Sequence, residues 1–201
     1  MSRNSARNPT REYIAHLAAR LMAEDGIEDH ALAKRKAARQ AGAADLRQLP
    51  DNDEIDTALR TYRALYQRQH PAQLRELRLL AVELMTEFAR FNPHLTGSVL
   101  SGTAGQFADI QLQLYIESVK EVEFELLNHG VRYETGATRF YAGDLPVDAA
   151  VLSFERDAVT VRLVVLTPRE LRSRIKTSPT GKPVERADQT AVELLLAQDE
   201  L

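Results

Sequence analysis

The sequence predicts an α+β fold, in which a helical N-terminal half is followed by a mixed β-sheet core with flanking helices. Up to Pro93, apolar residues recur at the three- and four-residue spacing of amphipathic helices. After Pro93 the pattern changes to the alternation of half-buried strands, most clearly over residues 109–116. We therefore expect a helical extension over residues 1–70 and an α+β core over residues 71–201.

The helices of the first half are predicted by apolar stripes and by residues that start or stop helices. Asp51 and Glu54 have the spacing of a capping box, which predicts that a helix begins there. The His70–Pro71 step separates this helix from the next one. Gly26 is expected to end the first helix. The expected helices cover residues 13–25, 28–41, 52–69 and 71–91.

The second half is predicted to contain short strands and turns. A glycine-rich loop separates a strand candidate at 95–100 from the alternating strand at 109–116. Ser118 and Glu121 have capping-box spacing, and Gly130 suits the end of the helix that they open. The other expected strands are 131–133 and 138–141 around a Thr135–Gly136 turn, and 147–154 and 159–166 around a turn at 155–157; a helix at 187–197 closes the chain.

Composition and charge exclude several classes of function. The 201 residues carry a net charge of −3, so the whole molecule is not a general polyanion binder. The chain has no cysteine, which excludes disulfides, thiolate catalysis and a cysteine-ligated zinc site. No window reaches the roughly 18 apolar residues that a membrane span requires, and no secretory signal is recognisable. We expect a cytoplasmic protein with no membrane contact.

The strand at 109–116 places two polar side chains next to each other at its start. Asp109 and Gln111 are two residues apart and therefore share a face, while Ile110 and Leu112 share the other. Aspartate is disfavoured in strands, so its presence here indicates a cap, an ion pair or a metal site. The preceding loop is rich in glycine, which lets backbone amides approach a phosphate closely.

These residues resemble the signature of the DNA polymerase β-like nucleotidyltransferase superfamily. The resemblance covers roughly residues 75–166 and rests on Gly97–Ser98, followed by Asp109-Ile110-Gln111-Leu112 on the next strand. In that family an acid-x-acid pair follows a Gly-Ser pair, and a third acid often lies on a later strand. Asp148, at the start of the strand at 147–154, matches such a third acid.

The resemblance implies a nucleotidyltransferase-like core that binds a nucleoside triphosphate with Mg²⁺. Asp109 and Asp148 would hold the metal and act in catalysis together with Gln111, and Gly97 and Ser98 would hold the phosphates. Two metal ions clamp the attacking and leaving oxygens in such a transfer, and magnesium prefers carboxylate ligands. The acceptor would be a hydroxyl of a small molecule, a protein or an RNA.

Gln111 stands where the family has its second acid, and this leaves two functional alternatives. One is a divergent transferase. The other is a catalytically degenerate module that binds a nucleotide or a partner, with the amphipathic helices at 53–91 as an oligomer or partner interface. A third, purely structural interpretation has Asp109 capping the glycine-rich loop.

The C-terminal segment carries a basic run whose role is open between two interpretations. Lys182 and its basic neighbours could reach a triphosphate or an RNA backbone, or they could form a solvated tail. The basic residues of this segment are Arg169, Arg172, Arg174, Lys176, Lys182 and Arg186.

Overall fold

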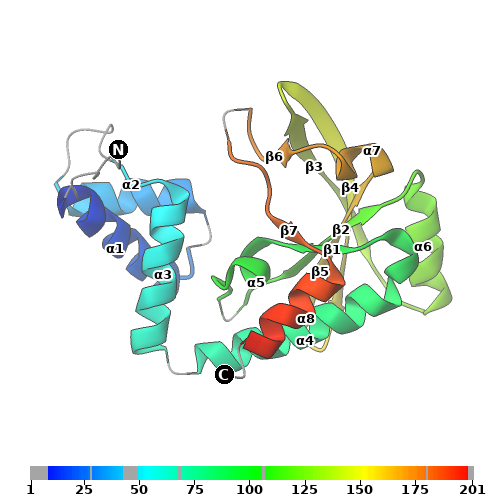
Figure 1. Ribbon diagram of the computed structural model, residues 1–201, viewed down its shortest axis with the longest axis horizontal. Helices are drawn as coiled ribbons and strands as arrows, with labels where there is room; N and C mark the ends of the chain where they lie inside the picture. Colours follow the sequence, from blue (N-terminus) through cyan, green and yellow to red (C-terminus); the bar gives the residue numbers. More distant parts are fainter. Residues whose placement is uncertain are drawn as a thin grey trace. The chain divides into compact units, whose positions relative to one another are not determined.

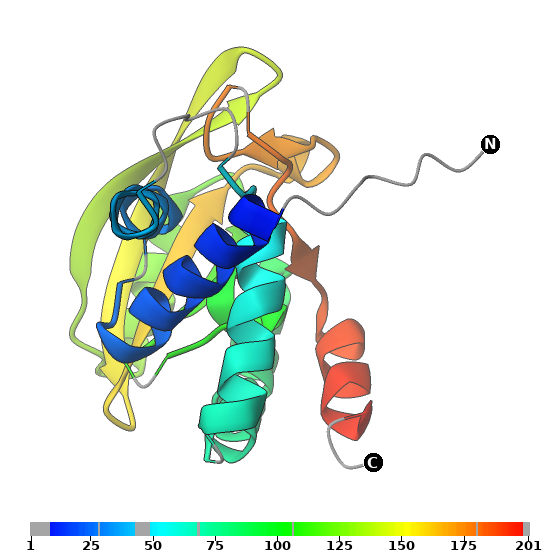
Figure 2. The same ribbon diagram turned by 90° about the vertical axis from the view of Figure 1, so that its left-hand side faces the viewer.

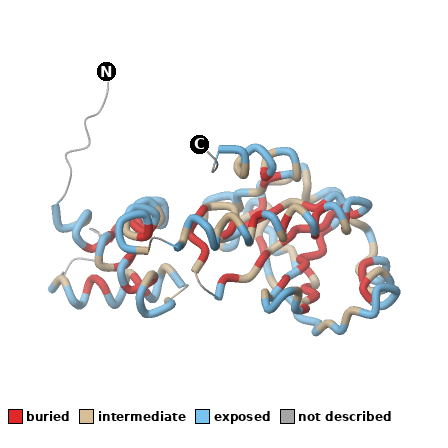
Figure 3. Tube along the Cα trace, turned by 90° about the horizontal axis from the view of Figure 1, so that it is seen from below, coloured by how far each residue is buried: buried red, intermediate tan, exposed pale blue. Residues whose placement is uncertain are grey.

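The computed structural model describes residues 9–27, 29–42, 49–67, 69–105, 107–179 and 181–198. The fold is α+β, as the sequence predicts, and the chain divides into two compact units, Met1–Pro71 and Ala72–Leu201. Each unit has its own apolar core, and buried residues gather between the elements of each (Figure 3). None of the described helices is both long and apolar enough to cross a membrane.

Unit 1 is built from the helices α1 (Pro9–Glu24), α2 (His30–Gln40) and α3 (Asn52–Tyr66). α1 packs against both of the others through a core that is rich in alanine, which allows helices to approach closely. The largest side chains in this core are Ile14, Ile55 and Leu59, all fully buried. Gly26, with φ +66°, follows α1 and confirms the expected end of that helix.

The start of α3 confirms the capping box that the sequence predicts. The Asp51 side chain accepts from the Glu54 backbone N–H at 2.9 Å, and the Glu54 carboxylate accepts from the Asp51 N–H at 2.7 Å. Arg11 of α1 donates to both oxygens of the same carboxylate at 2.8 and 2.9 Å. The hydrogen bond from Arg11, assisted by the Asp51 N–H, holds the pKa of Glu54 below its usual range.

This contact predicts how the stability of unit 1 depends on pH. A carboxylate whose pKa is lowered by folding stabilises the fold above its ordinary pKa of 4.5, and this stabilisation is lost as the pH falls through the lower folded value. Because the Glu54 side chain is 42% exposed, we expect a small effect. Denaturation at pH 7 and pH 3, followed by the helical circular dichroism signal, measures the free energy of unfolding. Its decrease from pH 7 to pH 3 should be smaller in Glu54→Gln than in the wild type. Equal losses in the two proteins would contradict this assignment.

Unit 2 contains a seven-stranded sheet in the order β6-β3-β4-β5-β2-β1-β7 (Figure 1). The central pair, β2 and β5, is parallel, and every other pair in this order is antiparallel. β3 and β4 form a long curved hairpin (Figure 2). The strands are β1 (His94–Thr96), β2 (Ile110–Tyr115), β3 (Glu134–Ala142), β4 (Leu145–Arg156), β5 (Val159–Leu166), β6 (Ile175–Lys176) and β7 (Arg186–Ala187).

One face of the sheet is covered by three helices, which form the main core. Leu112, Leu163 and Leu152 lie side by side on β2, β5 and β4 and face these helices. α8 begins against α4, where Gln189 donates to Thr86 at 3.2 Å. The helices are α4 (His70–Glu87), which is followed by the short 3-10 helix η2 (Ala89–Phe91), α6 (Val119–Asn128) and α8 (Gln189–Gln198).

The opposite face of the sheet is covered at one end by a smaller apolar cluster. Tyr115, Val164 and Phe140 belong to this cluster, together with Ile175 of β6 and Leu171 of α7 (Pro168–Leu171). Towards the other end, the side chains on this face become polar. Along β2 the row on this face is Gln111, Gln113 and Tyr115, because side chains alternate along a strand, and Asp109, directly before β2, continues this row.

Three local expectations are wrong. The strand expected at 95–100 ends at Thr96, because Gly97 has φ +75° and turns the chain into the short helix α5 (Gly97–Ser101). Thr135 and Gly136 do not form a turn between two strands; they lie inside the continuous strand β3, opposite Leu152 and Val151, and the residues 131–133, expected as a strand, precede it. Ser118 is at the N-cap of α6, but its side chain makes no capping hydrogen bond there.

Other expectations are confirmed. The hairpin expected at 147–166 is present as β4 and β5. Its turn lies later than the expected 155–157, at Asp157–Ala158, both with positive φ, because Glu155 and Arg156 still pair within the hairpin. The alternating segment is β2, and the closing helix is α8. Gly130, with φ +66°, directly follows the C-cap residue of α6, as expected.

Candidate functional site

Asp109 and Gln111 contact each other at the start of β2. The Gln111 Nε2 donates to both carboxylate oxygens of Asp109, at 3.1 Å to Oδ1 and 3.2 Å to Oδ2. Only 18% of the Asp109 side chain is exposed. The period of β2 places the two side chains on one face, so the sequence predicted this contact. Gln111 therefore stabilises Asp109 as a hydrogen-bond donor, in the position where a second acid would repel it.

Arg162 of β5 completes the environment of this carboxylate. β2 and β5 are parallel, and Arg162 lies directly opposite Gln111. Its Nη1 is 3.4 Å from Asp109 Oδ2, and 46% of its side chain is exposed. Sequence reasoning missed Arg162, although one charged residue between Val161 and Leu163 in a buried strand was a usable signal.

Gly97, the first residue of α5 and directly after β1, lies next to the side chain of Gln111. With φ +75° it adopts a left-handed conformation that side chains rarely tolerate, and a Cβ added there would lie 3.4 Å from Cδ and Oε1 of Gln111. The preceding Thr96 pairs with Gln111 across the sheet, and its hydroxyl donates to the Gln111 carbonyl at 3.3 Å. We call Gly97, Asp109, Gln111 and Arg162 the Asp109 cluster.

Arg78 of α4 holds α5 in place through two hydrogen bonds. Arg78 is 5% exposed and donates from Nε to the carbonyl of Val99 and from Nη2 to the carbonyl of Leu100, both at 3.2 Å. The half-buried Ser98 contributes its carbonyl, which accepts from the Thr103 N–H at 2.9 Å and closes the helix. Arg78 therefore positions the Gly97–Ser98 turn, a role that the helical stripe of α4 did not reveal.

Asp148 does not join the Asp109 cluster, so the expected pairing of the two acids is wrong. Arg162 lies opposite Ser153 of β4, and Asp148 is five residues from Ser153, an odd number that places it on the other face of the sheet. It is also roughly 16 Å further along the strand, at about 3.3 Å per residue. Sequence alternation within one strand cannot reveal this, because the face depends on the pairing between strands.

Asp148 instead forms an exposed ion pair with Arg139 of β3. Arg139 lies opposite Asp148 and donates from Nε to Oδ1 at 2.6 Å and from Nη2 to Oδ2 at 3.3 Å. The hydrogen bond from Arg139 lowers the pKa of Asp148 from its usual value. Asp148 is 68% exposed and has a partner of its own, so it is a surface residue of the β3–β4 hairpin.

The residues of the Asp109 cluster do not fit the magnesium ion that the resemblance implies. A magnesium site needs several hard oxygen ligands, and here both oxygens of the one carboxylate already accept from Gln111, with Arg162 beside Oδ2. Within the described parts of the chain, no group of three or more His, Cys, Asp or Glu residues is placed to hold a metal ion. No transfer step through magnesium follows from this geometry.

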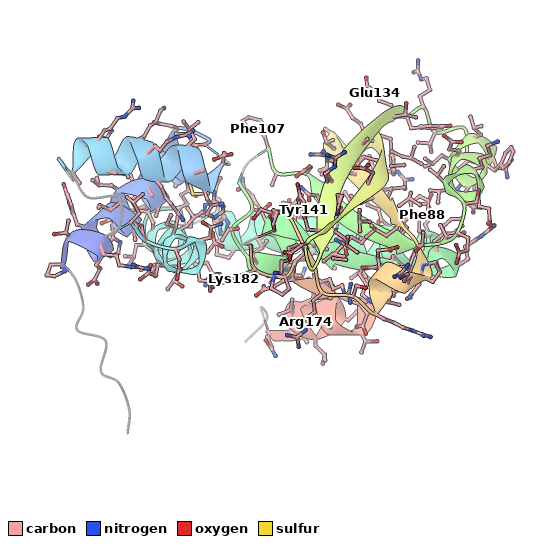
Figure 4. The ribbon with its side chains drawn as sticks, turned by 90° about the horizontal axis from the view of Figure 1, so that it is seen from above. Phe88, Phe107, Glu134, Tyr141, Arg174 and Lys182 are labelled. Atoms are coloured by element: carbon pink, nitrogen blue, oxygen red, sulfur yellow. The ribbon has the colours of Figure 1, made fainter. Side chains whose placement is uncertain are left out.

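The basic C-terminal segment is folded against the sheet over part of its length. Lys182 is exposed on the segment between β6 and β7 (Figure 4). The next residue, Pro183, bridges to Lys176, and the Val184 N–H donates to the Ile175 carbonyl at 2.8 Å. Arg186 has a structural role, because it donates to the Tyr115 hydroxyl at 2.9 Å and to the carbonyls at the end of α7.

The chemistry that the Asp109 cluster offers is the binding of an anion. Both oxygens of Asp109 accept hydrogen bonds from Gln111, and Oδ2 also accepts from Arg162. Arg162 has five N–H donors, and Asp109 is its one ion-pair partner among the described residues. Its exposed guanidinium therefore keeps donors for a phosphate or a carboxylate.

Comparison with known proteins gives no match to this chain among family models, curated proteins or solved structures.

Proposed function

We propose that unit 2 is a non-catalytic nucleotide-binding module, which holds the phosphates of its ligand at the Asp109 cluster. The observation that carries this proposal is the contact between Arg162 and Asp109. It places an exposed guanidinium where it can donate hydrogen bonds to a phosphate, and it occupies the acid that a transferase would use. The resemblance of Gly97–Ser98 and Asp109–Gln111 to the nucleotidyltransferase signature favours a nucleotide over other anions. Nucleotidyl transfer itself needs metal ions at the phosphates, and the cluster does not fit them.

Binding is tested by the thermal stability of the full chain with each of the nucleoside triphosphates, in magnesium and in EDTA. A ligand that binds only the folded state stabilises it by about 2.7 kcal/mol at one hundred times its Kd. We expect one or more nucleotides to raise the Tm, and Arg162→Ala to lose most of this increase. Arg139→Ala is the matched control, because Arg139 also pairs with an aspartate on the sheet but on the opposite face.

Release of pyrophosphate is measured in the same samples and separates binding from transfer. We expect none above the level of a blank. A wild-type Tm that no nucleotide changes, or an equal increase in Arg162→Ala, would overturn the proposal. Pyrophosphate release that Asp109→Ala abolishes would favour the transferase instead.

A further inference from the structure

We propose that Arg162 takes the place of the metal ion in this site, so that the Asp109 cluster binds its nucleotide in the metal-free form. This inference rests on the proposed function, and it concerns the form of the ligand and the source of the positive charge. In the family that the sequence resembles, carboxylates gather a divalent cation, and the cation binds the phosphates. In this chain a side chain supplies the cation.

The guanidinium of Arg162 lies where a metal ion would have to bind. Arg162 lies on β5 directly opposite Gln111, with Nη1 at 3.4 Å from Asp109 Oδ2. A positive group thus stands next to the carboxylate at the distance of an ion pair, on the side of the neighbouring strand. A divalent ion brought to the same oxygen would meet a like charge, which costs free energy at this separation.

Gln111 places an amide where the family that the sequence resembles has an acid. An acid at this position would add a negative charge, and Arg162 would then face two carboxylates. With glutamine, Asp109 and Arg162 balance each other, and Nε2 satisfies the carboxylate oxygens. The carboxylate therefore has its hydrogen-bond partners without a metal, and the guanidinium N–H groups that do not face Asp109 remain exposed to a phosphate.

The two charged side chains of the cluster differ in their exposure to solvent. The Asp109 side chain is 18% exposed, whereas Arg162 is 46% exposed. A ligand in solution therefore meets the guanidinium more readily than the carboxylate. Asp109 is best described as a positioning residue, which orients Arg162 and does not contact the ligand.

The first test measures the affinity of the wild-type protein for a nucleoside triphosphate by titration calorimetry, in EDTA and in excess magnesium. We expect binding in EDTA that is at least as tight as in magnesium, since magnesium occupies the phosphates that Arg162 would contact. We expect Arg162→Ala to weaken the binding in EDTA by at least about tenfold, the loss of one charge-assisted contact. Arg162→Lys should lose less, and Arg139→Ala should match the wild type.

The second test asks whether a guanidinium holds the metal position, and it needs no nucleotide. In the double variant Gln111→Asp with Arg162→Asp, three carboxylates surround the same point, and we expect it to bind Mn²⁺ alone, as seen by electron paramagnetic resonance. The wild type should bind none at this site. The variant Asp148→Ala in the same background should leave the Mn²⁺ signal unchanged, because Asp148 lies on the other face.

The outcomes separate this inference from the proposed function. Nucleotide binding that requires magnesium would overturn the inference and leave the nucleotide-binding proposal standing. No nucleotide binding under either condition would overturn both. Should the double variant fail to fold, the wild-type comparison of EDTA with magnesium still decides the question, and binding of Mn²⁺ by the wild type that Asp109→Ala removes would overturn the inference directly.

Discussion

Phe88→Ala is expected to lower the free energy of unfolding of unit 2 by about 3–5 kcal/mol, the largest effect of any substitution considered. Phe88 is completely buried at the end of α4, with its ring 6.3 Å from that of Phe91 and 6.4 Å from that of Phe154. Removing the ring leaves a cavity between α4 and the sheet, and it removes aromatic contacts as well. Figure 4 shows Phe88 within unit 2. Urea denaturation followed by circular dichroism measures the loss.

A matched control for this cavity is Phe124→Ala. Phe124 lies on α6 and is 62% exposed, so the same change of side chain removes little buried area. We expect a change within about 0.5 kcal/mol for this variant. Similar losses in the two variants would show that Phe88 does not support the core in the way described.

Arg78→Met is expected to cost about 3 kcal/mol and to loosen the Gly97–Ser98 turn. The substitution keeps most of the apolar stem but removes the donors to the carbonyls of Val99 and Leu100. A carbonyl that is shielded from water and loses its charged donor has no replacement hydrogen bond, which destabilises the fold. Each hydrogen bond to a charged group contributes about 1.5–3 kcal/mol. The unfolding free energy should fall, and so should the affinity for the nucleotide that we propose as the ligand, because α5 carries Gly97.

Arg90→Met controls for the loss of an arginine as such. Arg90 is 57% exposed and pairs with Glu125 at 3.1 Å, so its ion pair is a surface contact. Surface pairs contribute about 0–1 kcal/mol. If Arg78→Met were no more destabilising than Arg90→Met, the positioning role of Arg78 would have to be abandoned.

The sequence predicted those features of the fold that depend on short-range pattern. The alternation of β2, the hairpin of β4 and β5, and the capping box at Asp51 follow from residues that are close in the chain. The expectation failed where one glycine decides the conformation. Gly97 takes a left-handed conformation and ends β1, whereas Gly136 stays extended within β3, and the sequence does not distinguish these two uses.

The candidate site was predictable only within one strand. Asp109 and Gln111 are neighbours by the period of β2, so their contact followed from the sequence. Arg162 is 53 positions from Asp109, and it becomes a neighbour only through the parallel pairing of β5 with β2. Asp148 was assigned wrongly for the same reason, since an offset of one residue in strand pairing decides which face a side chain occupies.

The place of β2 in the middle of the sheet limits how the gene for this chain can change. β2 is paired on both sides, with β1 and with β5, so the gain or loss of one codon inside it would exchange its two faces. Leucines would then point to the side of the polar row, and Asp109 would be carried into the helix-covered core. The two-residue turns Gly143–Asp144 and Asp157–Ala158 carry a similar restriction, because the length of such a turn sets the register of the hairpin that it closes.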